Sequence, residues 1–311
     1  MTSRTSAHAK SGKRRARRCQ LSVPGSSEKM MAKAAALDLD HVFLDLEDAV
    51  APSAKPGARG LIVAALNELQ WKPRTVCVRI NDVETQWCHD DIIEVVTGAG
   101  GKIDTIMLTK AKSAHDVVFV HLLLDQLEAK LGLPHRIGIE CLIEEVEGMM
   151  NVDEIAASSD RLECLIFGMG DYSASQQMQV MSVGESGPYP GDVWHYPRYK
   201  MTIACRANGI DPVDGPYANF RNPDSYRREA ERAYALGMVG KWAIHPSQVE
   251  IAQQVFSPAA EAVASARKQK TAYAEALEQG LGAINVDGVM VDAASIRIVQ
   301  NLLDRADLYG M

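Results

Sequence analysis

Eight short apolar runs alternate with longer helical patterns along most of the chain, and this alternation limits the fold more than any other feature of the sequence. Strands joined by helical crossovers must run parallel, and a parallel sheet covered on both faces keeps its strands apolar throughout. Eight such units predict an α/β fold, a closed (β/α)8 TIM barrel. An open doubly wound sheet is the alternative, but it leaves the eighth unit unexplained. The eight runs are residues 19–23, 41–46, 75–80, 105–109, 136–143, 162–168, 211–216 and 241–246.

The stretches between these runs carry apolar residues at spacings of three and four, which is typical of amphipathic helices. Residues 55–69 and 113–132 show this spacing most clearly, and the second stretch ends on Gly132, a usual helix terminator. After the sixth run, residues 178–199 are aromatic and rich in Gly and Pro, which predicts an insertion on the loop face before a helix over residues 200–209.

Composition and pattern divide the chain into three parts. Residues 1–18 hold no acidic residue and a basic cluster from Lys13 to Arg18, so we expect a solvated, disordered tail there, with an organellar transit peptide as the alternative. Residues 19–256 form the predicted barrel. Residues 257–311 are too few for an independent domain and predict a C-terminal helical extension that packs on its own barrel or on a neighbouring subunit.

The overall charge and the cysteines argue against several classes of protein. The net charge is −7 despite the basic start, so the folded part is acidic, which argues against a nucleic-acid partner. The six cysteines show no Cys-x-x-Cys spacing, as expected in a reducing cytosol. No run of about eighteen apolar residues occurs, so we expect no membrane partner and a cytoplasmic protein.

Polar residues gather where the predicted strands end. In barrels of this type the chemistry takes place at the carboxyl ends of the strands, because the loops there vary while the strands hold them rigidly. We therefore expect the side chains of these residues to meet at one rim. They are Asp45, Glu47, Asp48, Arg79, Asn81, Lys110, Glu144, Glu145, Asp171, Asp214 and His245.

The second run places two acids on one face of its strand. Because side chains alternate along a strand, Asp45 and Glu47 point into the barrel mouth while the leucines between them pack outward. Glu47 is a candidate catalytic residue, and its alternative role is to pair with a rim arginine. Arg79 could bind a carboxylate or stabilise an oxyanion, and a salt bridge with Glu47 is compatible with both roles. Asp48 equally suits a helix cap.

Glu144 and Asp171 follow neighbouring strands, and two carboxylates from separate rigid elements are what Mg²⁺ requires. The sequence shows no His-rich or thiolate set that would favour zinc. The glycines of residues 168–171 would let backbone N–H groups approach an anion, although a tight turn is the default explanation of such glycines.

Seven motifs in order resemble the citrate lyase β-subunit-like branch of the HpcH/HpaI aldolase superfamily, and within it the malyl-CoA and β-methylmalyl-CoA lyases. The resemblance extends from about Arg18 to the C-terminal end and leaves out the basic start. The motifs are SVPGSSEKM, FLDLEDAVAP, VRIN, IEEVEGMMNVDEIAASS, GMGDYSAS, PVDGPY and LGMVGKWAIHP.

This resemblance implies a Mg²⁺-dependent barrel enzyme, with Mn²⁺ as a substitute, that makes or breaks a carbon–carbon bond between an acyl-CoA and a 2-oxo acid. The implied metal ligands are Glu144 and Asp171. Arg79 would stabilise the thioester oxygen, and Gly170 with Asp171 would hold the carboxylate of the oxo acid. The substrate would be a CoA thioester such as malyl-CoA, β-methylmalyl-CoA or citramalyl-CoA.

The resemblance also assigns residues outside the rim of the barrel. Lys33 would meet the CoA phosphates, and Ile244 and His245 would lie on the acyl-CoA side. Asp292 would reach into the site of an adjacent subunit and handle the proton of the acyl carbon, which implies a homotrimer or homohexamer. A malyl-CoA thioesterase, a CoA-independent hydroxy-oxo-acid aldolase and a non-enzymatic metabolite-binding barrel are the alternatives.

Overall fold

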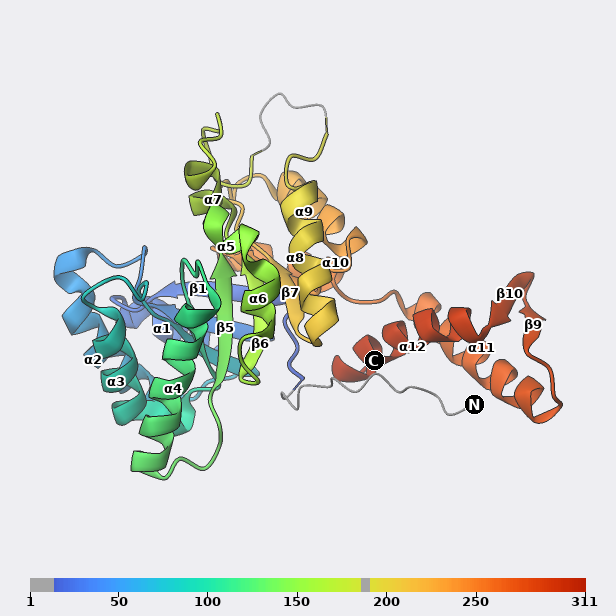
Figure 1. The fold of residues 1–311 in the computed structure, drawn as a ribbon, viewed down its shortest axis with the longest axis horizontal. Helices are drawn as coiled ribbons and strands as arrows, with labels where there is room; N and C mark the ends of the chain where they lie inside the picture. The colour runs from blue at the N-terminus through green and yellow to red at the C-terminus, as the bar shows by residue number, and fades with distance from the viewer. Residues whose placement is uncertain (1–13, 186–190) are drawn as a thin grey trace. The chain divides into compact units, whose positions relative to one another are not determined.

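The structure is a computed structural model that describes residues 14–185 and 191–311. These residues form two compact units, which divide between Gln253 and Gln254. In the first unit eight parallel strands close into a barrel in the order of the chain, β1 pairing with both β2 and β8 (Figure 1). This confirms the predicted TIM barrel, and each of the eight apolar runs overlaps one strand. The strands are β1 (Cys19–Pro24), β2 (His41–Asp45), β3 (Thr75–Arg79), β4 (Thr105–Leu108), β5 (Gly138–Ile143), β6 (Leu162–Phe167), β7 (Asp211–Asp214) and β8 (Gly240–Ala243).

Helices follow the strands and cover the outside of the barrel. They are α1 (Glu28–Ala35), α2 (Lys55–Glu68), α3 (Cys88–Ala99), α4 (Ala114–Leu131), α5 (Val146–Met150), α6 (Val152–Ala157), α7 (Met169–Ser175), α8 (His195–Asn208), α9 (Pro223–Ala235) and α10 (Val249–Val255), with short 3-10 turns η1 (Pro52–Ala54), η2 (Gly100–Lys102) and η3 (Pro246–Gln248).

Helix α8 begins at His195, earlier than the predicted start at residue 200. The carboxylate of Asp192 accepts the backbone N–H of Trp194 at 3.0 Å and so supports the start of the helix. Pro197 stands in the first turn, where its missing N–H removes no intrahelical bond. The predicted insertion is thus shorter than its sequence suggested, and residues 186–190 of it lie outside the described residues.

Side chains alternate along each strand, and the inward-facing ones form layers in the barrel. On β2 the fully buried His41, Phe43 and Asp45 follow one another at every second position. An apolar layer occupies the middle of the barrel, made of Phe43, Cys77, Met107, Leu142, Cys164, Ile166, Val213, Val239 and Trp242. Polar residues lie on either side of it, so the acids at the strand ends rest on a packed core.

Below the apolar layer lies a buried polar group, here called the floor network, which consists of Arg17, Gln20, His41, Thr105 and Glu140. Glu140 is its centre: it accepts hydrogen bonds from Gln20 Nε2 at 2.9 Å and Thr105 Oγ1 at 3.1 Å, and it meets His41 Nε2 at 2.9 Å. Burial alone would raise the pKa of Glu140, but the charges of His41 and Arg17 hold it well below its usual value.

The prediction of a solvated tail over residues 1–18 is wrong for residues 15–17. Arg15 and Arg17 are 7% and 1% exposed. Both donate to the carboxylate of Glu163, at 2.8 and 2.6 Å, and Arg15 also pairs with Asp104 at 2.6 Å. Acids near the starts of β4, β5, β6 and β7 therefore draw these arginines inward. Residues 1–13 lie outside the described residues.

The second unit is a helical hairpin with a small sheet. Helices α11 (Ala260–Glu278) and α12 (Ala293–Leu308) pack through a cluster of Val263, Ala266, Val299, Leu303 and Ala306. Between them the antiparallel strands β9 (Ala283–Val286) and β10 (Val289–Asp292) turn at Asp287 and Gly288, whose φ values of 51° and 85° suit a two-residue hairpin. The boundary between the units falls within α10, just before the predicted end of the barrel at residue 256.

All six cysteines are free and buried, as small apolar residues in the core. Within residues 14–185 and 191–311, no helix combines the length and the apolar character that crossing a membrane requires.

We expect Arg17→Met to lower the free energy of unfolding by about 3–5 kcal/mol, because it leaves the fully buried Glu140 without an arginine partner and removes one of the two arginines that pair with Glu163. Urea denaturation at one protein concentration measures this change. Arg136→Met is the matched control: its pair with Asp160, at 2.7 Å, is about half exposed, so its removal should change stability by at most about 1 kcal/mol. Equal, small effects of both substitutions would show that the floor network does not stabilise the barrel.

Candidate active site

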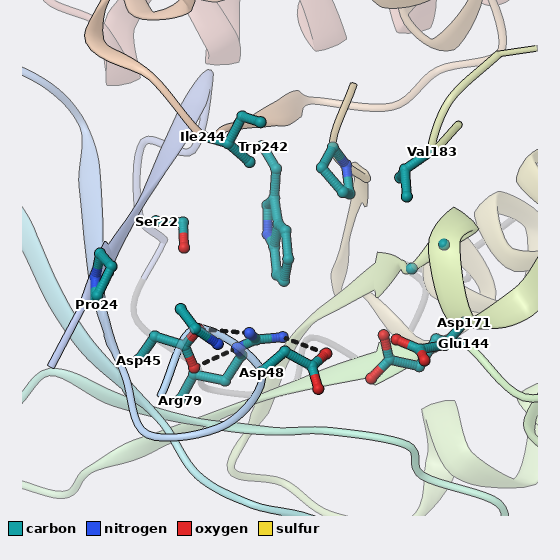
Figure 2. A pocket seen from close by; sticks show the side chains of 14 residues that line it. Ser22, Pro24, Asp45, Asp48, Arg79, Glu144, Asp171, Val183, Trp242 and Ile244 are labelled. Atoms are coloured by element: carbon teal, nitrogen blue, oxygen red, sulfur yellow. Dashed lines mark hydrogen bonds and ion pairs between the residues drawn. The ribbon is translucent and has the colours of Figure 1, made fainter. Parts of the chain in front are cut away.

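A cavity of about 380 Å³ lies at the carboxyl ends of the strands (Figure 2). Five of the residues that the sequence proposed for the site line it: Arg79, Glu144, Gly170, Asp171 and Ile244. The cavity is formed entirely by the barrel unit. Acids and an arginine share its wall with apolar residues, so it suits a ligand that has both a charged and an apolar part.

The pairing of β2 with β3 places Asp45 directly beside Arg79. The Arg79 guanidinium donates Nε–H and Nη2–H to the two carboxylate oxygens of Asp45, at 2.7 and 2.5 Å. Asp45 also accepts the backbone N–H groups of Glu47 and Ala49, at 2.8 and 3.2 Å. A fully buried carboxylate is thereby satisfied, and the guanidinium plane is fixed.

Two aromatic rings, whose centroids are 4.6 Å apart, lie together on one side of the guanidinium. The carbon at its centre lies 5.4 Å from the ring centroid of Trp242 and 5.9 Å from that of Phe43. Trp242 donates its indole N–H to Gln20 at 2.9 Å, which ties the cavity wall to the floor network. Arg79 is therefore a rigid cation at the edge of the cavity.

Glu47 contacts Arg79 but is not part of the cavity wall. One of its oxygens lies 3.1 Å from Arg79 Nη1 and the other accepts a hydrogen bond from Lys110 Nζ. Burial raises the pKa of Glu47 to about 7, against the opposing charge of Arg79. The neighbouring Asp48 lines the cavity instead. This position differs from the direct catalytic role predicted for Glu47 and favours a role in holding Arg79 and Lys110.

Glu144 and Asp171 turn their carboxylates into the same end of the cavity (Figure 2). Glu144 follows β5 and is 3% exposed, whereas Asp171 stands in the first turn of α7. A Cβ on Gly168 would lie 2.4 Å from Glu144 Oε2, so glycine is needed there to let the carboxylate pass. Burial raises the pKa of Glu144 to about 8, with the charge of Asp171 adding to the effect.

Lys110 connects these two acids. Its backbone N–H donates to Glu144 Oε1 at 3.0 Å, and its Nζ lies 3.7 Å from Asp171. Its φ of 50° is in the left-handed region, which is rare for a lysine. This backbone conformation allows one residue to orient Glu144 through its main chain and to balance the charge of Asp171 through its side chain.

Two oxygen ligands of this kind suit a hard divalent cation, which needs only one or two protein carboxylates and fills its other positions with water or substrate oxygens. Among the described residues, one set of three His, Cys or acidic donors also converges: His41, Cys77 and Glu140, within 4.8 Å of one another. The sequence did not reveal this set. Because Glu140 already accepts hydrogen bonds from Gln20 and Thr105, we interpret the set as part of the floor network.

The remaining residues proposed for substrate binding lie around the cavity or away from it. Ile244 lines it and is 40% exposed. His245 is exposed and stacks on Phe220, with ring centroids 4.6 Å apart. Lys33 is exposed in the last turn of α1. His245 and Lys33 are not part of the cavity wall, so any contact they make with a ligand lies outside it.

Asp292 lies in the second unit, where it ends β10 and caps α12. Its Oδ1 accepts the backbone N–H and the hydroxyl of Ser295, at 2.8 and 2.9 Å. These hydrogen bonds, the backbone one first, lower the pKa of Asp292 below its usual value and keep the carboxylate ionised. The structure thus shows a cap, and the role in an adjacent subunit remains a prediction.

Sequence reasoning gave no role to Asp45, Lys110, Trp242 and Val183. Asp45 and Lys110 were among the residues predicted at strand ends, but no role was assigned to them. The pairing of the second strand with the third places Asp45 beside Arg79 and could have predicted their ion pair. Trp242 stands two positions before Ile244, so the alternation along β8 was a usable signal. Val183 lies in the predicted insertion, where no periodic pattern indicates which side chain enters the cavity.

Comparisons with known proteins agree with this geometry. The sequence model of the family described as HpcH/HpaI aldolase/citrate lyase matches residues 18–246. An L-malyl-CoA/β-methylmalyl-CoA lyase of Cereibacter sphaeroides is 39% identical over 304 residues, which cover 94% of this chain and 96% of that protein. A (3S)-malyl-CoA thioesterase of the same species is 33% identical, covering 93% of this chain and 94% of that protein.

A solved structure is similar over nearly the whole chain. It is that of the protein CitE from Mycobacterium tuberculosis in complex with magnesium, acetoacetate and coenzyme A, with a TM-score of 0.72 and 29% sequence identity. The similarity covers 93% of this chain and 97% of that one.

We expect the affinity for Mn²⁺ to rise about tenfold per pH unit from pH 6 to 8 and to level off above pH 8. A cation bound by Glu144 must displace the proton that burial retains there, since the pKa of this carboxyl is raised to about 8. Calorimetric titration in buffers of different ionisation enthalpy should show about one proton released at pH 7. Glu144→Gln should abolish this release. Glu145→Gln, which changes the next residue, should retain it, and a pH-independent affinity of the unmodified protein would contradict the assignment.

Proposed function

The chain belongs to the HpcH/HpaI aldolase/citrate lyase family, and its relatives include carbon–carbon lyases. We propose that it is a Mg²⁺-dependent lyase of 3-hydroxyacyl-CoA thioesters. Its substrate would be malyl-CoA, β-methylmalyl-CoA or citramalyl-CoA, and its products an acyl-CoA and glyoxylate or pyruvate. The relative from Cereibacter sphaeroides, at 39% identity over 94% of this chain, supports this substrate class.

One observation carries the proposal: a fixed guanidinium and two carboxylates from neighbouring strand ends line the same cavity. The carboxylates of Glu144 and Asp171 would bind the cation, and the solved relative in complex with magnesium and coenzyme A supports magnesium as that cation. The bound cation would polarise the carbonyl of the oxo acid and lower the pKa of the substrate hydroxyl. The donor chemistry fits, because both ligands are hard oxygens and, among the described residues, no arginine or lysine side chain donates a hydrogen bond to the buried Glu144.

Arg79 would stabilise the charge that the reaction creates. In the direction of bond formation, the acyl α-carbon loses a proton, and the negative charge of the enolate collects on the thioester oxygen. The contacts to Asp45 and Glu47 use three of the five N–H groups of Arg79, which leaves the others for that oxygen. The α-carbon then bonds to the carbonyl carbon of the oxo acid, whose oxygen gains a proton and becomes the hydroxyl. Cleavage follows the same steps in reverse.

The other proposed roles concern binding and proton transfer. Gly170 and Asp171 would hold the carboxylate of the oxo acid, Ile244 and His245 would contact the acyl-CoA, and Lys33 would meet its phosphates. Asp292 of the partner subunit would take the proton from the α-carbon, which requires a homotrimer or homohexamer. Its ionised carboxylate is in the state that can accept this proton.

A thioesterase is the second candidate, because a (3S)-malyl-CoA thioesterase is 33% identical over 93% of this chain. Such an enzyme would transfer the acyl group to water in the same cavity. Malate and free CoA, formed without glyoxylate, would identify that activity.

We expect purified protein with Mg²⁺ to form a 3-hydroxyacyl-CoA when offered acyl-CoAs and 2-oxo acids in all combinations, with products identified by mass spectrometry. Asp171→Asn and Glu144→Gln should each lower kcat by about 10²-fold or more, because the cation would lose one of its two protein ligands. Glu145→Gln, which changes an acid outside the cavity wall, should keep the activity. Full turnover by either ligand variant would refute the metal assignment.

We expect Asp292→Asn to fold, to bind Mn²⁺ and to lose lyase turnover. Asparagine is as good a helix cap as aspartate, so α12 should be preserved while the proton acceptor is lost. Ser295→Ala is the control that weakens the cap and keeps the carboxylate.

Co-expression of Asp292→Asn with Glu144→Gln tests whether subunits share the site. Random assortment in a ring should give about one quarter of sites an intact barrel and an intact neighbouring Asp292, and so about one quarter of the normal activity. Mixed oligomers that stay inactive would argue against a shared site.

A further inference from the structure

Val183 forms an apolar part of the cavity wall beside the two carboxylates. It follows α7 in the predicted insertion, and its side chain lines the cavity. Figure 2 shows Val183 on the side of Glu144 and Asp171, with Ser22 and Pro24 on the opposite side. The acidic end of the cavity therefore has a small branched apolar group next to it.

Contacts on the far side hold the backbone of Val183 in place. Its carbonyl oxygen accepts the N–H of Ala218 at 3.0 Å. The next residue, Gly184, is buried with a φ of 84°, and a Cβ there would lie 2.8 Å from the ring of Tyr217. Only glycine suits both this φ and this close approach. The segment is thus fixed on the loop that follows β7.

The side chain of Val183 is held as well. A Cβ on Gly170 would lie 3.2 and 3.4 Å from the two methyl groups of Val183. These methyl groups therefore pack against the α-carbon of Gly170, the residue before Asp171. Because the backbone is fixed on one side and Gly170 lies on the other, Val183 has little freedom to withdraw from a larger ligand.

On the basis of the proposed function, we propose that Val183 selects the 2-oxo acid and makes the enzyme prefer glyoxylate to pyruvate. The two acids differ only in the group on the carbonyl carbon, which is hydrogen in one and methyl in the other. Their carboxylate and carbonyl oxygens would be drawn to the cation that Glu144 and Asp171 would hold, so this group is left to face an apolar wall. Val183 is the apolar residue packed against the α-carbon next to Asp171, and its methyl groups occupy the space that the methyl of pyruvate would need.

The test compares kcat/KM for glyoxylate and pyruvate with acetyl-CoA and Mg²⁺. We expect Val183→Ala to raise the pyruvate-to-glyoxylate ratio by about tenfold or more, because one methyl group in an apolar pocket changes discrimination by about 10- to 200-fold. Val183→Ile should lower the ratio. Val183→Thr keeps the shape of the side chain and should leave the ratio nearly unchanged.

Binding gives a readout that does not depend on turnover of pyruvate. The inhibition constant of pyruvate against glyoxylate should fall in Val183→Ala and rise in Val183→Ile. Ser22→Ala is the matched control, because it changes the opposite side of the same cavity and should leave both the ratio and this constant unchanged. Mn²⁺ affinity equal to that of the unmodified protein shows that each variant retains its folded site.

Two results would overturn the inference while leaving the lyase activity established. The first is a preference of the unmodified protein for pyruvate. The second is that neither Val183→Ala nor Val183→Ile changes the pyruvate-to-glyoxylate ratio of kcat/KM or the inhibition constant of pyruvate. Failure of the unmodified protein to condense any acyl-CoA with any 2-oxo acid would contradict the proposed function, and this inference with it.

Discussion

The buried ion pair between Asp45 and Arg79 determines the arrangement of the other charges in the cavity. A carboxylate with no exposure is stable only if every oxygen has a partner, and Asp45 obtains them from Arg79 and from two backbone N–H groups of its own loop. Two aromatic rings, Phe43 and Trp242, pack together beside the guanidinium that results. Glu47 then pairs with Arg79, and Lys110 pairs with Glu47 while its own backbone orients Glu144. Burial of one charge thus fixes a chain of neighbours as far as Asp171.

Much of this site could be predicted from the sequence, because carboxyl ends of parallel strands meet at one rim whatever lies between them. This rule alone brought Arg79, Glu144 and Asp171 together. The period-two rule put Asp45 and Glu47 on the side of Arg79, and both pair with it, but it gave no indication for Asp48, because β2 ends at Asp45 and the chain then turns. Side chains beyond a strand end no longer alternate, so Asp48 reaches the cavity wall and Glu47 does not.

Other features could not be predicted, because they depend on residues that only the closed barrel brings together. The basic cluster before β1 has the composition of a solvated tail, yet Arg15 and Arg17 meet acids from separate strands, among them Asp104 and Glu163. A pattern read along the chain does not show such long-range partners. The same holds for Val183, whose place depends on a contact with Ala218 in a loop of another strand.

Closure through β1 and β8 has a consequence for protein synthesis. Leu21 pairs with Ala243, so the first strand leaves the ribosome long before its second neighbour exists. At ordinary elongation rates of about 5–20 residues per second, the nascent chain carries one unpaired strand edge for roughly 10–40 seconds. Until β5 and β6 emerge, partway through this interval, Arg17 also lacks its partners Glu140 and Glu163. The partly made sheet therefore exposes an unpaired edge, which can pair with other chains, until the last strand of the barrel emerges. Slower translation would prolong that exposure.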